Sequence, residues 1–220
     1  MIRVVPDADP DAMPDAVSGP WRRRAPRSAA LVTGDGEVVD LPVERWHGPA
    51  DAAEVSLLGA VADPVLDVGC GPGRIVAALA GAGRIALGVD PSPAAVDLAL
   101  RSRAPVLRRS VFGPLPGEGR WATVLLLDGN VGIGGDPVVL LRRSHSLLRA
   151  GGQVVAEVGP PGSATGALTV RVEASDGVSP WFPWARVAAD AFAGLARAAG
   201  LRPAPAQAVV GRWFVRASRP

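Results

Sequence analysis

Five short apolar runs recur along the middle of the chain, and segments with helical spacing separate them. This alternation of strand and helix patterns predicts a parallel sheet that is covered by helices on both faces. The predicted strands are Val65–Val68, Arg84–Asp90, Pro105–Arg109, Trp121–Leu127 and Gln153–Val158. The predicted helices between them are Ile75–Ala82, Pro93–Arg103 and Val138–Leu148.

The fourth run, Trp121–Leu127, is apolar at nearly every position, which is typical of a strand buried on both faces. After the fifth strand, Leu168–Ala174 alternates like an added strand, and a helix is predicted from about Trp184 to Ala199. Pro203–Val210 and Trp213–Ala217 flank Gly211 and predict a closing hairpin. The last strand of the sheet therefore runs antiparallel to the others.

The first 60 residues have a different pattern. Residues 1–28 hold five prolines among Asp and Ala, a composition that buries little, so we expect a flexible arm. Ala29–Thr33 and Glu37–Leu41 flank Gly34-Asp35-Gly36 and predict a hairpin, and a helix follows from about Asp51 to Ala60. The chain thus divides into an arm (1–28), a hairpin with a helix (29–60) and a main domain (61–220).

Length and composition narrow the class of protein. The 220 residues, 48% of them hydrophobic, suffice for one α/β domain with a short extension. The sequence has no apolar stretch of membrane-spanning length and no signal-peptide pattern, and its one cysteine cannot form an internal disulfide, so we expect a cytoplasmic protein. Its sequence pI of 9.8 reflects a net charge of only +2 and an absence of lysine, and does not indicate a nucleic-acid partner.

A glycine-rich turn follows the first predicted strand. Asp67, Gly69, Gly71 and Gly73 form the pattern D-x-G-x-G-x-G, and a helix-compatible run begins directly afterwards. A strand, a glycine turn and a helix in this order present free backbone N–H groups to a ligand at the sheet edge. The dinucleotide fingerprint G-x-G-x-x-G would need glycine at position 74, where this chain has Arg74.

The pattern resembles motif I of the class I S-adenosyl-L-methionine (SAM) dependent methyltransferases. Asp90, at the end of the second strand, stands where that family has an acid for the ribose hydroxyls. The resemblance implies a Rossmann-like, doubly wound, mostly parallel sheet of seven strands with an antiparallel last strand. It also implies that SAM is the cofactor and that residues 61–220 form the methyltransferase domain, with residues 29–60 covering the cofactor site.

The same resemblance implies a set of cofactor-binding residues. The methionine end would lie at the glycine turn, the ribose at the end of the second strand, and the adenine after the third strand. The family usually has an acid at the adenine edge, where this chain has Ser110. The implied cofactor residues are Asp67, Gly69, Cys70, Gly71, Gly73, Asp90, Pro91, Ser110, Val111 and Asp128.

Other residues are candidates for the acceptor pocket. Asp128 leaves the fourth strand as in motif IV of the family, and Asn130 follows it where ligands bind in open sheets. Two prolines stiffen a short segment that contains Trp181 and Trp184, which could form a rigid apolar wall. The candidate acceptor residues are Trp46, His47, Asn130, Trp181 and Trp184, and His47 is the one candidate for a general base.

Several chemistries find no support in the sequence. Two scattered histidines and one cysteine do not form a metal site. The Asn-Pro-Pro-aromatic motif of amide-directed nucleic-acid methyltransferases is absent, as is a basic and aromatic stripe, so we expect no nucleic-acid partner. We therefore expect methyl transfer to a small molecule. A non-catalytic SAM-binding protein and an NAD-type oxidoreductase remain as alternatives.

Overall fold

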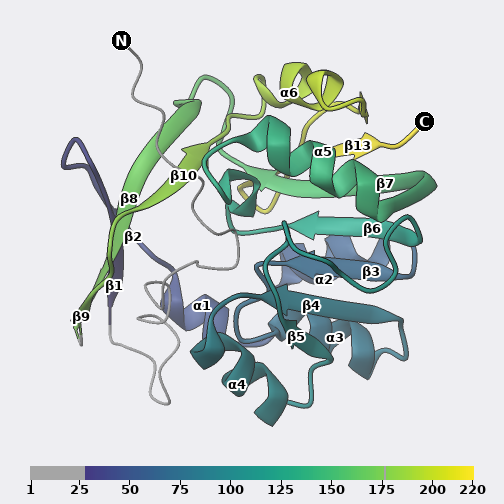
Figure 1. Ribbon diagram of the computed structural model, residues 1–220, viewed down its shortest axis with the longest axis horizontal. Coiled ribbons are helices and arrows are strands. Elements are labelled where there is room, and N and C mark those ends of the chain that lie inside the picture. Colours follow the sequence, from purple (N-terminus) through teal and green to yellow (C-terminus); the bar gives the residue numbers. More distant parts are fainter. Residues whose placement is uncertain (1–27, 176) are drawn as a thin grey trace.

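A computed structural model describes residues 28–175 and 177–220, and its strands form two sheets (Figure 1). The arm predicted for residues 1–28 lies outside the described residues except for Ser28. No helix in the described part of the chain is both long and apolar enough to cross a membrane.

The larger sheet has the predicted doubly wound arrangement. Its strands lie in the order β11-β13-β7-β6-β3-β4-β5, with β12 also paired to β13. Strands β3 to β7 are parallel, and β13 is antiparallel to β7. The strands are β3 (Val65–Val68), β4 (Ala86–Asp90), β5 (Val106–Arg108), β6 (Trp121–Leu126), β7 (Leu148–Val158), β11 (Arg202–Pro203), β12 (Gln207–Val209) and β13 (Arg212–Ser218).

The structure differs from the expected seven strands. The sheet has eight strands among the described residues, because two short segments, β11 and β12, each pair separately with β13. Residues 203–210 were expected to form one strand of the closing hairpin. Strand β7 also begins earlier than expected, at Leu148.

Helices cover both faces of this sheet, because successive strand residues point to opposite faces. Leu66 and Leu126 pack with α5 (Pro137–Leu147) and α6 (Phe192–Ala198) in one core. Val65 and Leu125 pack with α2 (Ala52–Gly59) and α3 (Arg74–Gly81) in the core on the other face. Helix α4 (Pro93–Arg101) adds a smaller cluster beside α3. All six residues of β6 are buried, as the nearly continuous apolar run predicted.

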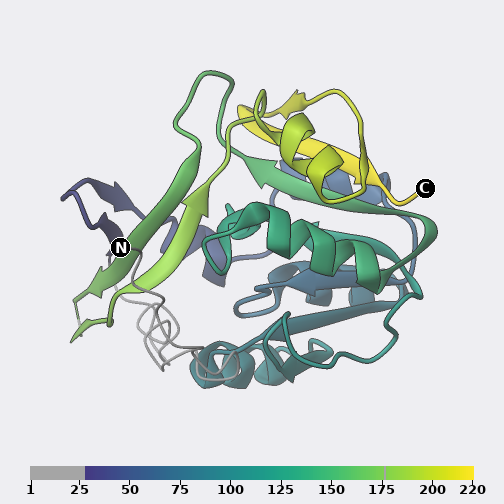
Figure 2. The same cartoon turned by 45° about the horizontal axis from the view of Figure 1, so that its top comes forward.

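A second sheet, in the order β10-β8-β1-β2 with β9 paired to β8, stands beside the larger one (Figures 1 and 2). Figure 1 shows β6 pointing toward it, so it faces the carboxyl ends of the parallel strands. The short helix α1 (Val43–His47) lies between the two sheets in this view. The strands are β1 (Ala29–Thr33), β2 (Val38–Asp40), β8 (Gly166–Ala174), β9 (Gly177–Val178) and β10 (Phe182–Arg186).

The predicted hairpin and the added strand are confirmed as β1, β2 and β8, whereas the helix predicted from Trp184 is wrong at its start. Residues 182–186 instead form β10, which pairs antiparallel with β8, and the helix runs only from Phe192 to Ala198. Pro183 can occupy β10 because this is an edge strand, where one missing N–H is tolerated. The pairing with β8 thus decides the structure of this segment.

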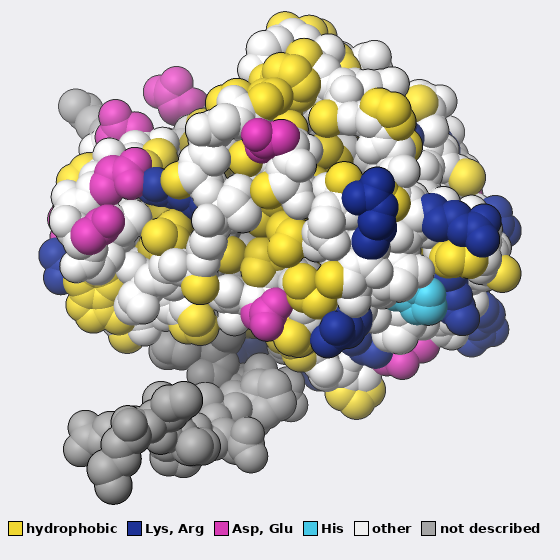
Figure 3. All heavy atoms as spheres, turned by 90° about the horizontal axis from the view of Figure 1, so that it is seen from above, with side chains coloured by type: hydrophobic (Ala, Val, Ile, Leu, Met, Phe, Trp, Pro, Cys, Tyr) yellow, Lys and Arg dark blue, Asp and Glu magenta, His cyan; other side chains and the backbone are white. Residues whose placement is uncertain are grey.

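Charged side chains are unevenly distributed on the face of the molecule that Figure 3 shows. In Figure 3, acidic side chains gather toward the end that carries the second sheet, and arginine side chains gather toward the opposite end. The small net charge of +2 therefore conceals an uneven distribution.

Candidate functional site

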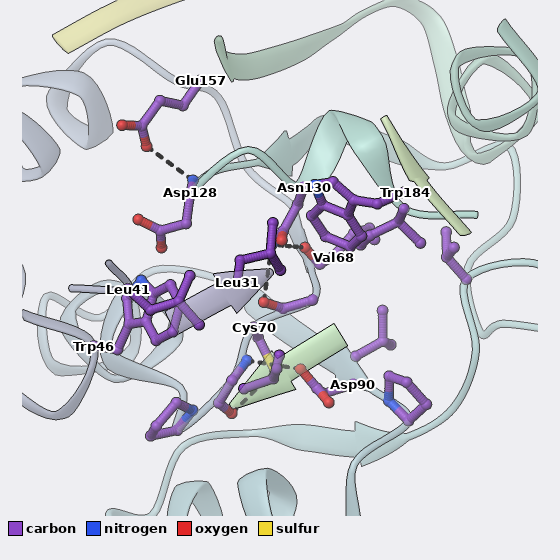
Figure 4. Close-up of a pocket in the computed structure, with 18 of the residues that line it drawn as sticks. Leu31, Leu41, Trp46, Val68, Cys70, Asp90, Asp128, Asn130, Glu157 and Trp184 are labelled. Carbon is purple, nitrogen blue, oxygen red and sulfur yellow. Dashed lines mark hydrogen bonds between the residues drawn. The ribbon is translucent and has the colours of Figure 1, made fainter. Parts of the chain in front are cut away.

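A cavity of about 420 Å³ lies between the carboxyl ends of the parallel strands and the second sheet (Figure 4). Its lining residues from the main sheet and following loops are Val68, Gly69, Cys70, Gly71, Pro72, Arg74, Val89, Asp90, Pro91, Arg109, Ser110, Val111, Phe112, Asp128, Asn130, Ile133 and Glu157. Those from the second sheet and α1 with its preceding loop are Leu31, Val39, Asp40, Leu41, Pro42, Arg45, Trp46, Val172, Phe182 and Trp184. The cavity is thus built by both sheets.

The turn after β3 requires glycine for reasons internal to the protein. Gly69, Gly71 and Gly73 have φ angles of +69°, +54° and +80°, which other residues rarely adopt. A methyl group at Gly69 would lie 2.6 Å from Asn130 Nδ2, and one at Gly73 would lie 2.9 Å from the Cβ of Ala104. Gly73 does not line the cavity, and its role is to let the start of α3 pack against the following helix and loop.

Asp90 is held in place by backbone groups at the end of β4. Its Oδ2 accepts a hydrogen bond of 2.9 Å from the Gly71 N–H, and its Oδ1 accepts one of 2.8 Å from the Ser92 N–H. Burial raises the pKa of Asp90 to about 6, although both hydrogen bonds oppose this shift. Each oxygen keeps a lone pair, so the carboxylate can accept a pair of neighbouring hydroxyls from the cavity.

Asp67 lies behind the glycine turn and does not line the cavity. The side chain is buried, and Oδ2 has no hydrogen-bond partner among the described residues. Burial raises the pKa of Asp67 to about 8, against the opposing effect of Arg74, and nearby Asp128 and Asp90 raise it further. The carboxyl is therefore mostly protonated at neutral pH.

Asp128 is the centre of an ionic cluster at the end of β6. Its backbone has a φ of +55°, and its N–H donates a hydrogen bond of 2.8 Å to Glu157 Oε2. One carboxylate oxygen accepts from Arg45 at 2.5 Å, and the other accepts from Arg74 at 2.7 Å. This carboxylate is therefore neutralised within the protein.

The cluster extends away from the cavity to Glu54 of α2 and to Asp51 at the N-cap of that helix. Arg74 also donates to Glu54, which is fully buried, at 2.5 Å. Burial would raise the pKa of Glu54, but the hydrogen bonds and charge of Arg74 outweigh it and the pKa is lowered. Arg212 of β13 binds both oxygens of Glu157, at 2.8 and 2.6 Å, and donates to Asp51 at 2.8 Å. The members of the cluster come from six separate segments, so no local pattern in the sequence could indicate it.

The remaining predicted residues divide into two groups. Cys70, Pro91, Ser110, Val111, Asn130, Trp46 and Trp184 line the cavity, and burial raises the pKa of the Cys70 thiol. His47, in the last turn of α1, and Trp181 do not line it. Trp181 is 45% exposed, and the guanidinium of Arg171 lies 4.8 Å from its ring centroid. The described residues contain no group of three or more His, Cys, Asp or Glu side chains suited to a metal ion.

The comparisons with known proteins agree with this geometry. Residues 65–152 match a family model described as a methyltransferase domain. A Bacteroides fragilis SAM-dependent methyltransferase, solved with S-adenosyl-L-homocysteine, is 18% identical over 96% of each chain, with a TM-score of 0.76. A Burkholderia thailandensis 1,6-didemethyltoxoflavin-N1-methyltransferase is 25% identical over 76% of each chain, with a TM-score of 0.54.

A sugar N-methyltransferase from a Streptoalloteichus species is 21% identical, with 70% of this chain and 79% of that chain covered and a TM-score of 0.52. None of the curated proteins matches the sequence significantly. The fold of the described chain is that of the class I SAM-dependent methyltransferases. Residues 65–152, from β3 into β7, match the methyltransferase domain family, and two of the similar structures hold the SAM product S-adenosyl-L-homocysteine.

Proposed function

We propose that this protein transfers the methyl group of SAM to a small-molecule nucleophile in the cavity between its two sheets. The observation that carries this proposal is the continuity of the cavity. It extends from the carboxylate of Asp90 to an apolar wall that contains Trp46 and Trp184. A polar end suited to a nucleoside therefore shares one space with an apolar end suited to a second molecule.

In this proposal the turn around Gly69 and Gly71 would hold the methionine end of the cofactor, and Asp90 would accept the ribose hydroxyls. Ser110 and Val111 would lie along the adenine edge. When bound, SAM supplies an electrophilic methyl group on its sulfonium. The protein then has to align the acceptor, exclude water and keep its own charges in place.

Two structural features support a role in alignment. The second sheet closes one side of the cavity with Leu31, Val172 and Phe182, which are apolar and would displace water from a bound acceptor. The arginines around Asp128 neutralise the carboxylate nearest to the end of β6. In this proposal residues 29–60 cover the cofactor site, and residues 61–220 form the methyltransferase domain.

Small-molecule acceptors are named for two of the structural neighbours, 1,6-didemethyltoxoflavin in one and a sugar in the other. The cavity volume of about 420 Å³ is in the range of small-molecule sites. A non-catalytic SAM-binding protein would have the same cofactor end, so binding alone does not separate the two functions. An NAD-type oxidoreductase is disfavoured by Arg74, which stands in place of the third glycine of the dinucleotide fingerprint.

Calorimetry followed by a turnover assay tests the proposal. The purified protein should bind S-adenosyl-L-homocysteine with micromolar affinity, about 8 kcal/mol, and should not bind NAD. Labelled SAM should then yield a labelled small-molecule product when it is incubated with the protein and a library of amines, phenols and heterocycles. Tight binding of NAD, with no binding of S-adenosyl-L-homocysteine, would contradict the proposed use of SAM. Binding without transfer to any library member would favour the non-catalytic alternative.

A further inference from the structure

The side of the cavity opposite the glycine turn is an aromatic and aliphatic surface. Phe182 and Trp184 of β10 contact each other edge to face, with ring centroids 6.2 Å apart and planes at 89°. Leu31 and Val172 extend this surface along β1 and β8, and Trp46 adds a second indole from α1. Trp46 and Trp184 both pack against the apolar cluster of the second sheet, and Figure 4 shows them apart, with Leu31 between them in this view. A flat ring system placed on this surface would contact apolar groups along its face.

The glycines after β6 hold this surface in position. A methyl group added at Gly132 would collide with the carbonyl oxygen of Ala185 and would lie 2.8 Å from Nε1 of Trp184. A methyl group at Gly135 would lie 3.0 Å from the Cβ of Pro183. Strand β10 therefore packs directly on the turn that follows β6. The Trp184 indole is a fixed part of the wall, which favours a rigid and flat ligand.

The charged groups on this side of the cavity are already paired. Arg45 binds Asp128, and Glu157 is held through both oxygens by an arginine of β13. The other charged lining residues away from the glycine turn, Asp40 and Arg109, are exposed to solvent. An ionised acceptor group would lose its hydration here without gaining an unpaired, buried counter-charge among the described residues. The wall therefore favours an uncharged acceptor.

One polar group with a defined orientation lies beside the glycine turn, where the turn meets this surface. The side-chain amide of Asn130 donates hydrogen bonds of 2.9 Å to the Val68 carbonyl and 3.0 Å to the Gly69 carbonyl. Both N–H donors of the amide are thus used, and its Oδ1 is the atom left for a ligand. Because an amide oxygen accepts and does not donate, a group that binds it must carry an N–H or O–H.

From these observations we propose that the acceptor is a flat, uncharged, largely apolar ring compound whose N–H or O–H group donates to Asn130 Oδ1. This inference rests on the proposed function and adds the substrate class to it. Trp46 and Trp184 contact the ring, and the amide of Asn130, held by its two hydrogen bonds, selects the hydrogen-bond donor. Asn130 is therefore a specificity-determining residue in the acceptor site.

A series of naphthalenes that share one ring system tests the proposal by binding alone. The probes are 2-naphthol, 2-methoxynaphthalene, 2-naphthoate and 2-naphthylmethylammonium, titrated calorimetrically into the protein saturated with S-adenosyl-L-homocysteine. We expect 2-naphthol to bind about tenfold more tightly than the methoxy compound, the value of one hydrogen bond. The two charged probes should bind more weakly than 2-naphthol.

Three variants assign the preference to residues. Trp184→Leu should weaken the binding of 2-naphthol about tenfold, because the contact between the rings is lost. Its affinity for S-adenosyl-L-homocysteine should be unchanged. Trp181→Leu, three residues earlier and outside the cavity, is the matched control and should bind every probe normally. Asn130→Ala should abolish the preference for 2-naphthol over the methoxy compound. The preference is measured as the ratio of the two dissociation constants, which a general loss of affinity would leave unchanged.

The following results would contradict the proposed substrate class. Tighter binding of either charged probe, or equal binding of the naphthol and its methyl ether by the wild-type protein, would overturn the substrate class. So would the absence of binding by every probe while S-adenosyl-L-homocysteine binds normally, and in that case the proposed function would stand. If S-adenosyl-L-homocysteine itself does not bind, the proposed function fails and the substrate class fails with it.

Discussion

Arg45 donates a hydrogen bond of 2.5 Å to Asp128, which lies 83 residues later in the chain. This contact joins the short helix before the main sheet to the end of one of its central strands. The arginine side chain is 28% exposed and the aspartate side chain 12%, so the pair is only partly screened by water. Through it, the segment that covers the cavity is attached to the residues at its base.

Replacing Arg45 by methionine should loosen that segment while the main sheet stays intact. Methionine keeps much of the side-chain length but removes the charged donor, and Asp128 retains Arg74 as a partner. The free energy of unfolding should fall by about 1.5–3 kcal/mol, the value of a hydrogen bond between charged groups. Amide hydrogen exchange should accelerate in residues 29–47 and remain unchanged in β3 and β6.

A suitable control for this experiment is Arg171→Met, which removes the arginine of a half-exposed pair with Glu173 in the same second sheet. It should change stability little, because exposed ion pairs contribute weakly. Equal acceleration of exchange in both variants would show that the attachment does not depend on the contact between Arg45 and Asp128.

The affinity for S-adenosyl-L-homocysteine should depend on pH through Asp90. Its carboxyl has a pKa of about 6, and only the ionised form offers acceptors on both oxygens to ribose hydroxyls. Affinity should therefore be highest above pH 7 and should decline as the pH falls through 6 toward 5. Calorimetric titrations at these pH values measure the effect.

Asp90→Asn should bind more weakly at pH 7.5, and its affinity should change little between pH 5 and 7.5. Asp97→Asn, an exposed site on α4, should keep the wild-type pH profile. A pH dependence that persists in the Asp90 variant would assign the titration to another group.

The stability of the ligand-free protein should depend on pH through Asp67. Its pKa in the folded state is about 8, above the ordinary value of 3.8, so the folded protein binds a proton that the unfolded chain releases. Stability from this group is present at low pH and is lost as the pH rises toward 8, by about 1.4 kcal/mol per pH unit.

Asp67→Asn keeps the shape of the side chain and cannot ionise. The variant should therefore gain stability relative to the wild-type protein as the pH is raised from 6 to 8, and urea unfolding at each pH measures the difference. Wild-type and variant curves that stay parallel across this range would mean that Asp67 does not hold the proton.

Gly132→Ala should displace β10 and the wall that it carries. The added methyl group would meet backbone atoms of Ala185, which cannot rotate away. We expect a loss of about 3 kcal/mol or more in stability from overpacking, together with weaker binding of 2-naphthol. Gly59→Ala, at the end of α2, has open space around its added methyl group and should be neutral or slightly stabilising. A stable Gly132→Ala protein with normal probe binding would show that β10 adapts easily.

The sequence alone determined the larger sheet and its glycine turn. Strands such as Trp121–Leu126 are apolar on both faces, and the glycine spacing after Val68 is incompatible with most other turns. These signals are local, because burial on both faces and a positive φ each limit which residues a position accepts. For the same reason the position of Asp90 at the end of a strand could be predicted from the chain itself.

The tertiary structure decided the second sheet and the surroundings of the site. Strand β10 has a proline in its second position and forms only because β8 pairs with it. Trp181 and Trp184 appear equivalent in the sequence, yet the pairing register places one outside the cavity and one within it. Arg45, Arg74 and Asp128 likewise carry no shared pattern, because their contact depends on segments that are distant along the chain. Local sequence determines which backbone conformations are possible, and long-range packing determines which side chains meet.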